Sequence, residues 1–184
     1  DRRCGSGLQT LIYGILQVAT GASDLVITGG AESMSNAPFY TTRARWGIKA
    51  PALAFSDSLA KGRVSAGGVN FPVPGGMLET AENLRNDYQV SRPEQDGFAA
   101  ESQRRALDAQ ARGVFDDEII PVSVPSRKGE TVVVADETPR QTTVEALAEL
   151  KPIRLREDPD ATVTAGNAST QNDGASACIV ATEA

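Results

Sequence analysis

The N-terminal part of the chain joins two strongly apolar patterns that limit the fold it can adopt. Apolar residues such as Ile12 and Leu16 recur at three- and four-residue spacing over residues 4–20, which predicts a helix that ends near Gly21. Residues 24–28 then form a short apolar run, which predicts a buried strand in a parallel pairing. A strongly apolar helix followed at once by such a strand favours an α/β layered core.

The same apolar character returns near the C-terminus, where residues 175–180 predict a further strand. The sequence between these two apolar parts lacks their pattern at its start, because residues 36–78 are rich in proline and glycine. We therefore predict a core of residues 1–35 and 160–184, interrupted by an inserted loop subdomain at 36–159. Within the insert, helices are expected at 55–61, 79–88, 92–112 and 143–150, and strands at 118–124 and 130–135.

Composition excludes several classes of function. The formal net charge of −6 disfavours nucleic acid as a partner, since phosphate binding needs a basic face. No apolar run approaches the roughly 20 residues that span a bilayer, so no membrane partner is expected. The 2 cysteines cannot supply the ligands of a typical zinc site, and no metal is expected. Their separation gives no disulfide framework, which favours a cytoplasmic protein. Both termini are expected to be cuts in a longer protein.

The absence of histidine is the most restrictive compositional fact. With a His count of 0, this chain cannot form a Ser-His-Asp or Cys-His catalytic set by itself. Any histidine chemistry must therefore come from residues outside this sequence.

Cys4 is the candidate nucleophile. It precedes Gly5, Ser6 and Gly7 at the start of the predicted apolar helix. The unpaired N–H groups and positive dipole end of a helix N-terminus stabilise a thiolate, and small neighbours allow a bulky substrate to approach. The Cys4 backbone N–H is placed where it can face an oxyanion. By local physics alone, a small buried cysteine that packs at a helix start fits somewhat better than a nucleophile.

Several segments, in order along the chain, together resemble the thiolase family of acetyl-CoA acetyltransferases and 3-ketoacyl-CoA thiolases. The likeness covers essentially the whole chain, and several motifs in order are far more specific than one. The segments are Arg2-Arg3-Cys4-Gly5-Ser6-Gly7-Leu8-Gln9, Gly29-Gly30-Ala31-Glu32-Ser33-Met34-Ser35-Asn36-Ala37-Pro38, Met77 with Thr80-Ala81-Glu82-Asn83, and Thr164-Ala165-Gly166-Asn167-Ala168-Ser169 with Asn172-Asp173-Gly174-Ala175. Ser91, Arg92, Glu94, Gln95 and Asp96 also fit.

The resemblance implies a fold and a reaction. The fold would be part of the N-terminal half of a layered α-β-α thiolase, with the inserted loop domain binding coenzyme A. Cys4 would attack a 3-ketoacyl-CoA, release acetyl-CoA and keep the acyl group as a thioester, which a second coenzyme A then takes. The enzyme would be an acetyl-CoA C-acyltransferase or C-acetyltransferase, as in fatty acid β-oxidation. It would hold no permanent cofactor, and coenzyme A and acyl-CoA would be its substrates.

The resemblance also implies residues that contact coenzyme A. Ser169 and Ala165 match positions that meet the pantetheine arm, and Arg140 matches a basic residue near the adenine nucleotide. Met77 matches a residue that lines the tunnel near the cysteine. From the residues alone, Ser169 also fits a helix N-cap or turn, Arg140 a solvated arginine and Met77 core packing.

The resemblance has gaps and departures. The family's catalytic histidine and second cysteine lie in its C-terminal half, and Cys178 does not match the latter, so we predict Cys178 to be a buried structural thiol. Gly76 stands where many biosynthetic-type members have histidine. This favours a 3-ketoacyl-CoA or dicarboxylic 3-ketoacyl-CoA thiolase over an acetoacetyl-specific one.

Two other functions stay open at this level. One is a thiolase-like protein that binds acyl-CoA or lipid without chemistry, although a binder has no need of an activated thiol. The other is a ketoacyl synthase relative, which the TAEN and NDGA segments fit less well. If the thiolase interpretation holds, the full-length protein is expected to be a homodimer or homotetramer, and this chain alone is expected to be inactive.

Overall fold

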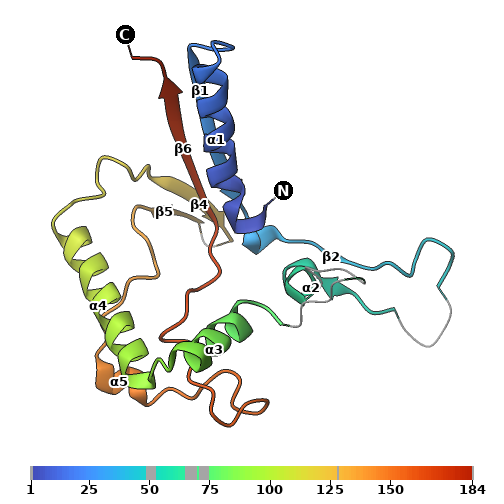
Figure 1. Cartoon of the computed structure of the whole chain (residues 1–184), viewed down its shortest axis with the longest axis vertical. Coiled ribbons are helices and arrows are strands. Elements are labelled where there is room, and N and C mark those ends of the chain that lie inside the picture. The colour runs from blue at the N-terminus through green and yellow to red at the C-terminus, as the bar shows by residue number, and fades with distance from the viewer. Residues whose placement is uncertain (1, 49–52, 65–69, 71–74, 128, 184) are drawn as a thin grey trace. The chain divides into compact units, whose positions relative to one another are not determined.

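The computed structural model describes residues 2–48, 53–64, 70, 75–127 and 129–183 (Figure 1). They belong to two compact units, one of Asp1–Pro72 with Gln171–Ala184 and one of Val73–Thr170. The division predicted above, a core at 1–35 and 160–184 around an insert at 36–159, concerns the domains of a family fold and stays a prediction.

The predicted N-terminal helix is present and begins slightly later than expected. Residues Arg3–Gly5 form a 3-10 turn, η1, and the α-helix α1 follows at Ser6–Ala19. Gly21 has a φ of +70°, a left-handed conformation that glycine adopts without strain, and the helix ends before it as predicted. α1 packs against the strands β1 (Leu25–Glu32) and β6 (Gly174–Ala181).

β1 and β6 form an antiparallel two-stranded sheet, in which Leu25 pairs with Ala181 and Glu32 with Gly174. The predicted parallel pairing is therefore wrong, because an apolar run carries no information about the direction of its neighbour. The predicted burial of this strand is also wrong. α1 covers the face that carries Thr28, so Ile27, which alternates to the opposite face, is 71% exposed.

The rest of the first unit, where the structure describes it, is mostly irregular, as the prolines and glycines predicted. A short 3-10 turn, η2 (Met34–Asn36), precedes β2 (Phe39–Tyr40), which pairs antiparallel with β3 (Ser56–Asp57). The helix expected at 55–61 is found as α2 (Ser58–Val64). The Ser35 backbone N–H donates to Asp173 Oδ1 at 2.8 Å and so ties η2 to the residue before β6. Most of the proline-rich stretch 69–75 lies outside the described residues.

The second unit contains the remaining elements. Ser91 accepts from the Glu94 N–H at 3.4 Å, and Glu94 Oε2 accepts from the Ser91 N–H at 2.8 Å, which confirms the predicted capping box. The hairpin turns at Gly129, whose φ is +119°. The elements are the helices α3 (Met77–Tyr88), α4 (Arg92–Ala111) and α5 (Val144–Ala148), and the hairpin of β4 (Val122–Ser126) and β5 (Gly129–Val133).

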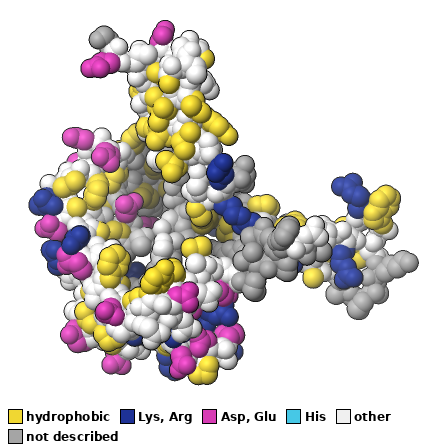
Figure 2. Space-filling view, in the orientation of Figure 1, with side chains coloured by type: hydrophobic (Ala, Val, Ile, Leu, Met, Phe, Trp, Pro, Cys, Tyr) yellow, Lys and Arg dark blue, Asp and Glu magenta, His cyan; other side chains and the backbone are white. Residues whose placement is uncertain are grey.

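Few apolar side chains are buried in either unit. Among the described residues, the buried apolar side chains are Leu147, Ala161 and Val163, all in the second unit. Large apolar side chains on α1 stay accessible, and Figure 2 shows such side chains gathered over α1 and β6; examples are Leu8, 65% exposed, and Tyr13, 56% exposed. None of the described helices has the length and apolar content needed to cross a membrane.

Gly14 determines how closely α1 approaches the sheet. It is buried, and a Cβ atom at this position would lie 2.5 Å from Thr28 Cγ2 and 3.5 Å from Val26 Cγ1. Gly14→Ala should therefore push α1 away from the sheet and lower the free energy of unfolding by about 1–3 kcal/mol, as overpacked sites do.

Urea unfolding of the purified protein would measure this loss. Gly7→Ala is the matched control, because no atom lies within 4 Å of a Cβ at Gly7, in the same helix. There the added methyl group should be neutral or stabilise by up to about 1 kcal/mol. Equal stability of the two variants would contradict close helix-to-sheet contact at Gly14.

Asp173 should make the first unit sensitive to acid. Hydrogen bonds from Ser35, its backbone N–H first, lower the pKa of the Asp173 carboxyl below its ordinary value. A carboxyl with a lowered folded-state pKa stabilises the fold above its unfolded-state pKa, near 4, and this contribution disappears as the pH falls through the folded-state pKa.

Asp173→Asn keeps an oxygen acceptor for Ser35 and removes the titration. We therefore expect stability to decline less steeply below about pH 4 in this variant than in the wild type, as measured by thermal unfolding across pH. Asp24→Asn, which removes an exposed carboxylate from the same unit, is the control. A wild-type acid profile in Asp173→Asn would refute the expectation.

Candidate functional site

Cys4 lies at the entrance to α1, where its sequence position predicted it. It is the middle residue of η1 and is exposed, so its sulfur is accessible in this unit. The turn is closed by the Gly5 N–H, which donates to the Arg2 carbonyl at 3.1 Å. The Arg2 N–H donates to Ser6 Oγ at 2.9 Å and ties the turn to the first residue of α1.

Arg3 gives the residue before Cys4 an unusual backbone. Its φ is +53°, in the left-handed region that costs a non-glycine residue about 1 kcal/mol or more. Its guanidinium donates from Nη1 to the Gly62 carbonyl at 2.9 Å and so ties η1 to α2. The turn that presents Cys4 is therefore held at both its backbone and its side chains.

Cys178 is not the buried thiol that we predicted. Its residue is exposed, although its Sγ lies 3.0 Å from Oγ1 of the buried Thr28 in a hydrogen bond across β1 and β6. The prediction failed because, among the described residues, β6 pairs with β1 alone, and such an edge strand leaves side chains accessible even on the face toward α1. Its contact with Thr28 is that of a structural side chain.

The other four predicted site residues, Met77, Arg140, Ala165 and Ser169, belong to the second unit. Arg140 and Ala165 lie together, because Arg140 Nη2 donates to the Ala165 carbonyl at 3.4 Å. Met77 begins α3 and is 71% exposed, which contradicts the core-packing alternative. Ser169 is exposed and donates from Oγ to the Thr170 carbonyl at 3.2 Å; no helix begins there, so it is no N-cap.

A hollow of about 490 Å³ adjoins Arg140. Of the two arginines in its lining, Arg104 is paired with Glu101, so Arg140 is the cation suited to a phosphate group. Arg104 is held there by two hydrogen bonds to Glu101, at 2.7 and 2.9 Å, and bonds from Arg104 and then Arg105 lower the pKa of Glu101 to about 2. The lining residues are Arg104, Leu107, Arg140, Gln141, Thr142, Thr143 and Ala146.

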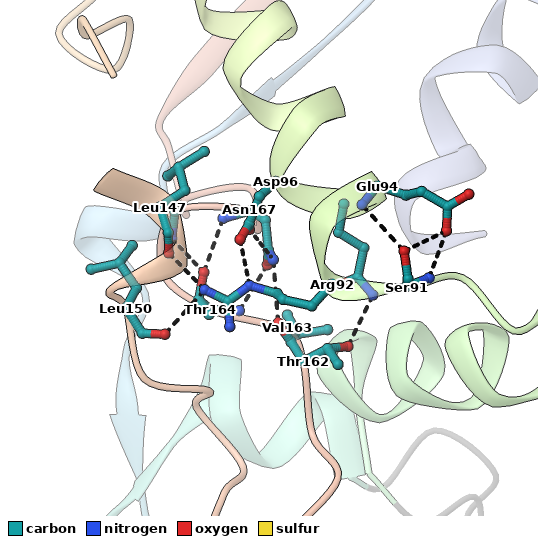
Figure 3. Close-up of polar contacts among 12 residues, drawn as sticks. Ser91, Arg92, Glu94, Asp96, Leu147, Leu150, Thr162, Val163, Thr164 and Asn167 are labelled. Atoms are coloured by element: carbon teal, nitrogen blue, oxygen red, sulfur yellow. Dashed lines mark hydrogen bonds and ion pairs between the residues drawn. The ribbon is translucent and has the colours of Figure 1, made fainter. Parts of the chain in front are cut away.

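Residues 162–167, which include Ala165, form a tightly bonded turn (Figure 3). Thr164 is fully buried, and its Oγ1 accepts from the Gly166 and Asn167 N–H groups at 3.1 and 3.3 Å. Asn167 Oδ1 accepts from the Thr164 N–H at 2.7 Å, and Asn167 Nδ2 donates to the Thr162 carbonyl at 3.2 Å. The side chains of the turn therefore satisfy its own backbone.

A buried carboxylate on α3 holds the start of this turn. Glu82 is 5% exposed, and its Oε1 accepts from the Thr162 and Val163 N–H groups at 2.9 and 2.8 Å. Its Oε2 accepts from Arg85 Nε at 3.1 Å and from the Thr162 hydroxyl at 3.3 Å. Arg85 in turn donates to Asp158 at 3.0 Å.

A second buried carboxylate, on α4, holds the end of the turn (Figure 3). Asp96 is 1% exposed; its Oδ1 accepts from Asn167 Nδ2 at 3.0 Å and its Oδ2 from Arg92 Nε at 2.6 Å. Arg92 Nη2 also donates to the Leu147 and Leu150 carbonyls at 2.6 and 3.1 Å. The turn is therefore bonded to α4 and, through Arg92, to the end of α5.

Sequence reasoning matched Glu82, Asp96 and Asn167 to motifs without giving them a structural role. A signal was present, since Glu82 and Asp96 each have an arginine three or four residues away that can neutralise them within one helix. The sequence could not show that the two carboxylates meet one turn from opposite ends. Within the described parts of the chain, no cluster of His, Cys, Asp and Glu could hold a metal ion.

Solved structures of known enzymes share this fold. Human mitochondrial 3-ketoacyl-CoA thiolase superimposes with a TM-score of 0.84 at 40% identity, over 98% of this chain and 44% of that chain. The Bacillus anthracis acetyl-CoA acetyltransferase superimposes with a TM-score of 0.82 at 38% identity, over 96% of this chain and 43% of that chain. The predicted α/β fold, matching the N-terminal half of a thiolase, is therefore confirmed.

Sequence comparisons identify the same family. Beta-ketoadipyl-CoA thiolase of Pseudomonas putida is 44% identical over 190 residues, which cover 98% of this chain and 45% of the relative. A probable acetyl-CoA acyltransferase of Staphylococcus epidermidis is 43% identical over 185 residues, which cover 100% of this chain and 45% of the relative. The chain thus spans about half the length of these relatives. The family model described as "Thiolase, N-terminal domain" matches residues 1–184, and the chain belongs to the thiolase family.

Proposed function

We propose that the protein containing this chain is an acyl-CoA C-acyltransferase in which Cys4 is the nucleophile. The observation that carries the proposal is the accessible Cys4 thiol in a tied 3-10 turn at the entrance to α1, within a chain of the thiolase family. The N-terminal end of a helix favours negative charge on a thiolate and on an oxyanion nearby.

The reaction proceeds through two acyl transfers. The Cys4 sulfur attacks the ketone carbon of a 3-ketoacyl-CoA, the bond between the α and β carbons breaks, and its electron pair is protonated to give acetyl-CoA. The thiol of a second coenzyme A then attacks the acyl-cysteine and releases acyl-CoA with the Cys4 thiol restored. Both steps need groups that move protons, and a chain with a His count of 0 must receive them from the rest of the protein.

The second unit is proposed to bind coenzyme A. The exposed Ala165 and Ser169 offer small side chains to a pantetheine arm, and Met77 offers an exposed apolar side chain. The hollow beside Arg140 has the charge and size to receive part of a nucleotide with its phosphates. No cofactor is proposed beyond these substrates.

The substrate is proposed to be a 3-ketoacyl-CoA longer than acetoacetyl-CoA, or a dicarboxylic one. Gly76 in place of histidine supports this, and so does the Pseudomonas putida relative, whose name gives β-ketoadipyl-CoA as its substrate. Degradation as in β-oxidation, a cytoplasmic location and assembly as a homodimer or homotetramer are further parts of the proposal. The exposed apolar side chains of α1 support assembly, because large accessible apolar surface usually meets a partner.

Cys4→Ser in the complete protein should abolish labelling by acetyl-CoA. A serine hydroxyl is a far weaker nucleophile than a thiolate at neutral pH, so intact-protein mass spectrometry should show the acetyl adduct on the wild type and none on the variant. Thiolysis should fall by at least about 10³-fold.

Cys178→Ser is the matched control and should keep both the adduct and the turnover. An adduct that persists in Cys4→Ser would remove Cys4 from its proposed role. Binding of coenzyme A by a wild type that never forms an adduct would favour the non-catalytic acyl-CoA-binding alternative.

The purified 184-residue chain should show no thiolysis of acetoacetyl-CoA or longer 3-ketoacyl-CoA. It contains Cys4 but no histidine that could activate the thiol. The assay follows loss of the 3-ketoacyl thioester by absorbance, with the Cys4→Ser chain as a control for contaminating host thiolase. Turnover above that control would show that the chain itself supplies the acid and base groups.

A further inference from the structure

Two buried carboxylates reach the turn at residues 162–167 from two different helices. We infer that Glu82 and Asp96 are positioning residues, which fix the backbone of this turn and thereby set the affinity for the coenzyme A thioester. The inference rests on the proposed function, in which the turn and Ser169 meet the pantetheine arm. Neither carboxylate is assigned contact with substrate.

Glu82 is bonded through both oxygens in a way that only a carboxylate satisfies. One oxygen accepts from two backbone N–H groups, and the other accepts from Arg85 Nε and the Thr162 hydroxyl. A glutamine has one acceptor oxygen, so its NH₂ group would face the Arg85 donor and leave a conflict between two donors in a buried place. Charge-assisted bonds of this kind are roughly twice as strong as neutral ones.

Asp96 is restricted in the same manner. Its oxygens face two donors, Asn167 Nδ2 and Arg92 Nε, and the residue is 1% exposed. An asparagine can satisfy one donor only. Asn167 ties the end of the turn to its start, because its side chain also donates to the Thr162 carbonyl and accepts from the Thr164 N–H. Loss of its partner on α4 would therefore loosen both ends of the turn.

The opposite side of the turn is the one available to a ligand. Gly166 is buried against the side chains of Leu147 and Leu150, where a Cβ atom would collide with both. Ala165, one residue earlier, is exposed, and its carbonyl accepts from Arg140. The inner side is thus bonded to helices while the outer side stays open. A ligand that meets the outer side then meets a backbone already in place, which reduces the ordering cost of binding.

The test uses the complete protein and compares Glu82→Gln, Asp96→Asn and Asp108→Asn. Asp108 is the matched control, because it lies on α4 and forms an ion pair with Arg112, as Asp96 does with Arg92, but its side chain is 54% exposed. Calorimetry measures the Kd for coenzyme A, and steady-state thiolysis measures KM and kcat.

For Glu82→Gln and Asp96→Asn, we expect Kd and KM to rise by about tenfold or more, since a buried partner is left unsatisfied. The kcat at saturating substrate should stay within about threefold of the wild type, the pattern of lost uniform binding. Asp108→Asn should leave all three constants unchanged. A role in folding alone would lower the active fraction, and with it the binding stoichiometry and apparent kcat, without changing Kd or KM.

A second variant keeps the test decisive if Asp96→Asn folds poorly. In Asp96→Asn with Asn167→Asp, position 96 can accept from Arg92 and donate to position 167, which restores the bond between the two residues but removes the bond from position 167 to the Thr162 carbonyl. Its Kd should therefore recover in part and lie between the values of Asp96→Asn and the wild type.

The outcomes separate the inference from the proposed function. A wild type that binds coenzyme A, together with variants of unchanged Kd and KM, would overturn the positioning role alone. A wild type that neither binds coenzyme A nor turns over a thioester would overturn the proposed function and this inference with it.

Discussion

The antiparallel pairing of β1 with β6 is the interaction on which the first unit depends. It joins residues 25–32 to residues 174–181, and most of the chain lies between them. Closing so long a loop costs conformational entropy that grows only slowly with its length, so a continuous eight-residue ladder and the packing of α1 can offset it. Without this ladder, α1 would have no sheet to pack on, and Cys4 would stand at the entrance of an unsupported helix.

The second unit depends largely on buried charged and polar side chains that are hydrogen-bonded. Its buried apolar side chains are few, whereas Glu82, Asp96 and Thr164 are all buried and bonded. Among the described residues, no buried side-chain nitrogen or oxygen lacks a hydrogen-bond partner. A network of this kind contributes little net stability compared with an apolar core, but it fixes one arrangement, because each alternative leaves a polar group unsatisfied.

Local patterns in the sequence predicted the elements well. The capping box at Ser91 and Glu94, the stop at Gly21 and the turn at Gly129 each depend on chemistry within a few residues, and each is found in the structure. The predictions failed where the outcome depended on distant residues. The direction of β1 depends on its pairing with β6, and the exposure of Cys178 depends on the place of β6 at the edge of a two-stranded sheet. A run of apolar residues indicates that a segment can be buried, but it does not indicate which elements lie beside it.

The candidate site, too, has features that the local sequence predicts and features that depend on distant residues. The position of Cys4 at a helix entrance follows from the neighbouring sequence, whereas the contact of Arg140 with Ala165 joins residues 25 positions apart. The meeting of Glu82 and Asp96 at one turn depends on the placement of α3 and α4 around residues 162–167. No spacing rule within either helix contains that information.

The backbone of Arg3 has a consequence for substitution at this position. Its left-handed conformation favours glycine or asparagine, while its bond to Gly62 needs a long side chain with a donor at its end. Glycine would relax the backbone and lose the bond, whereas lysine would keep a donor and the backbone strain. A change at position 3 can therefore displace the turn that holds the sulfur without touching the sulfur itself.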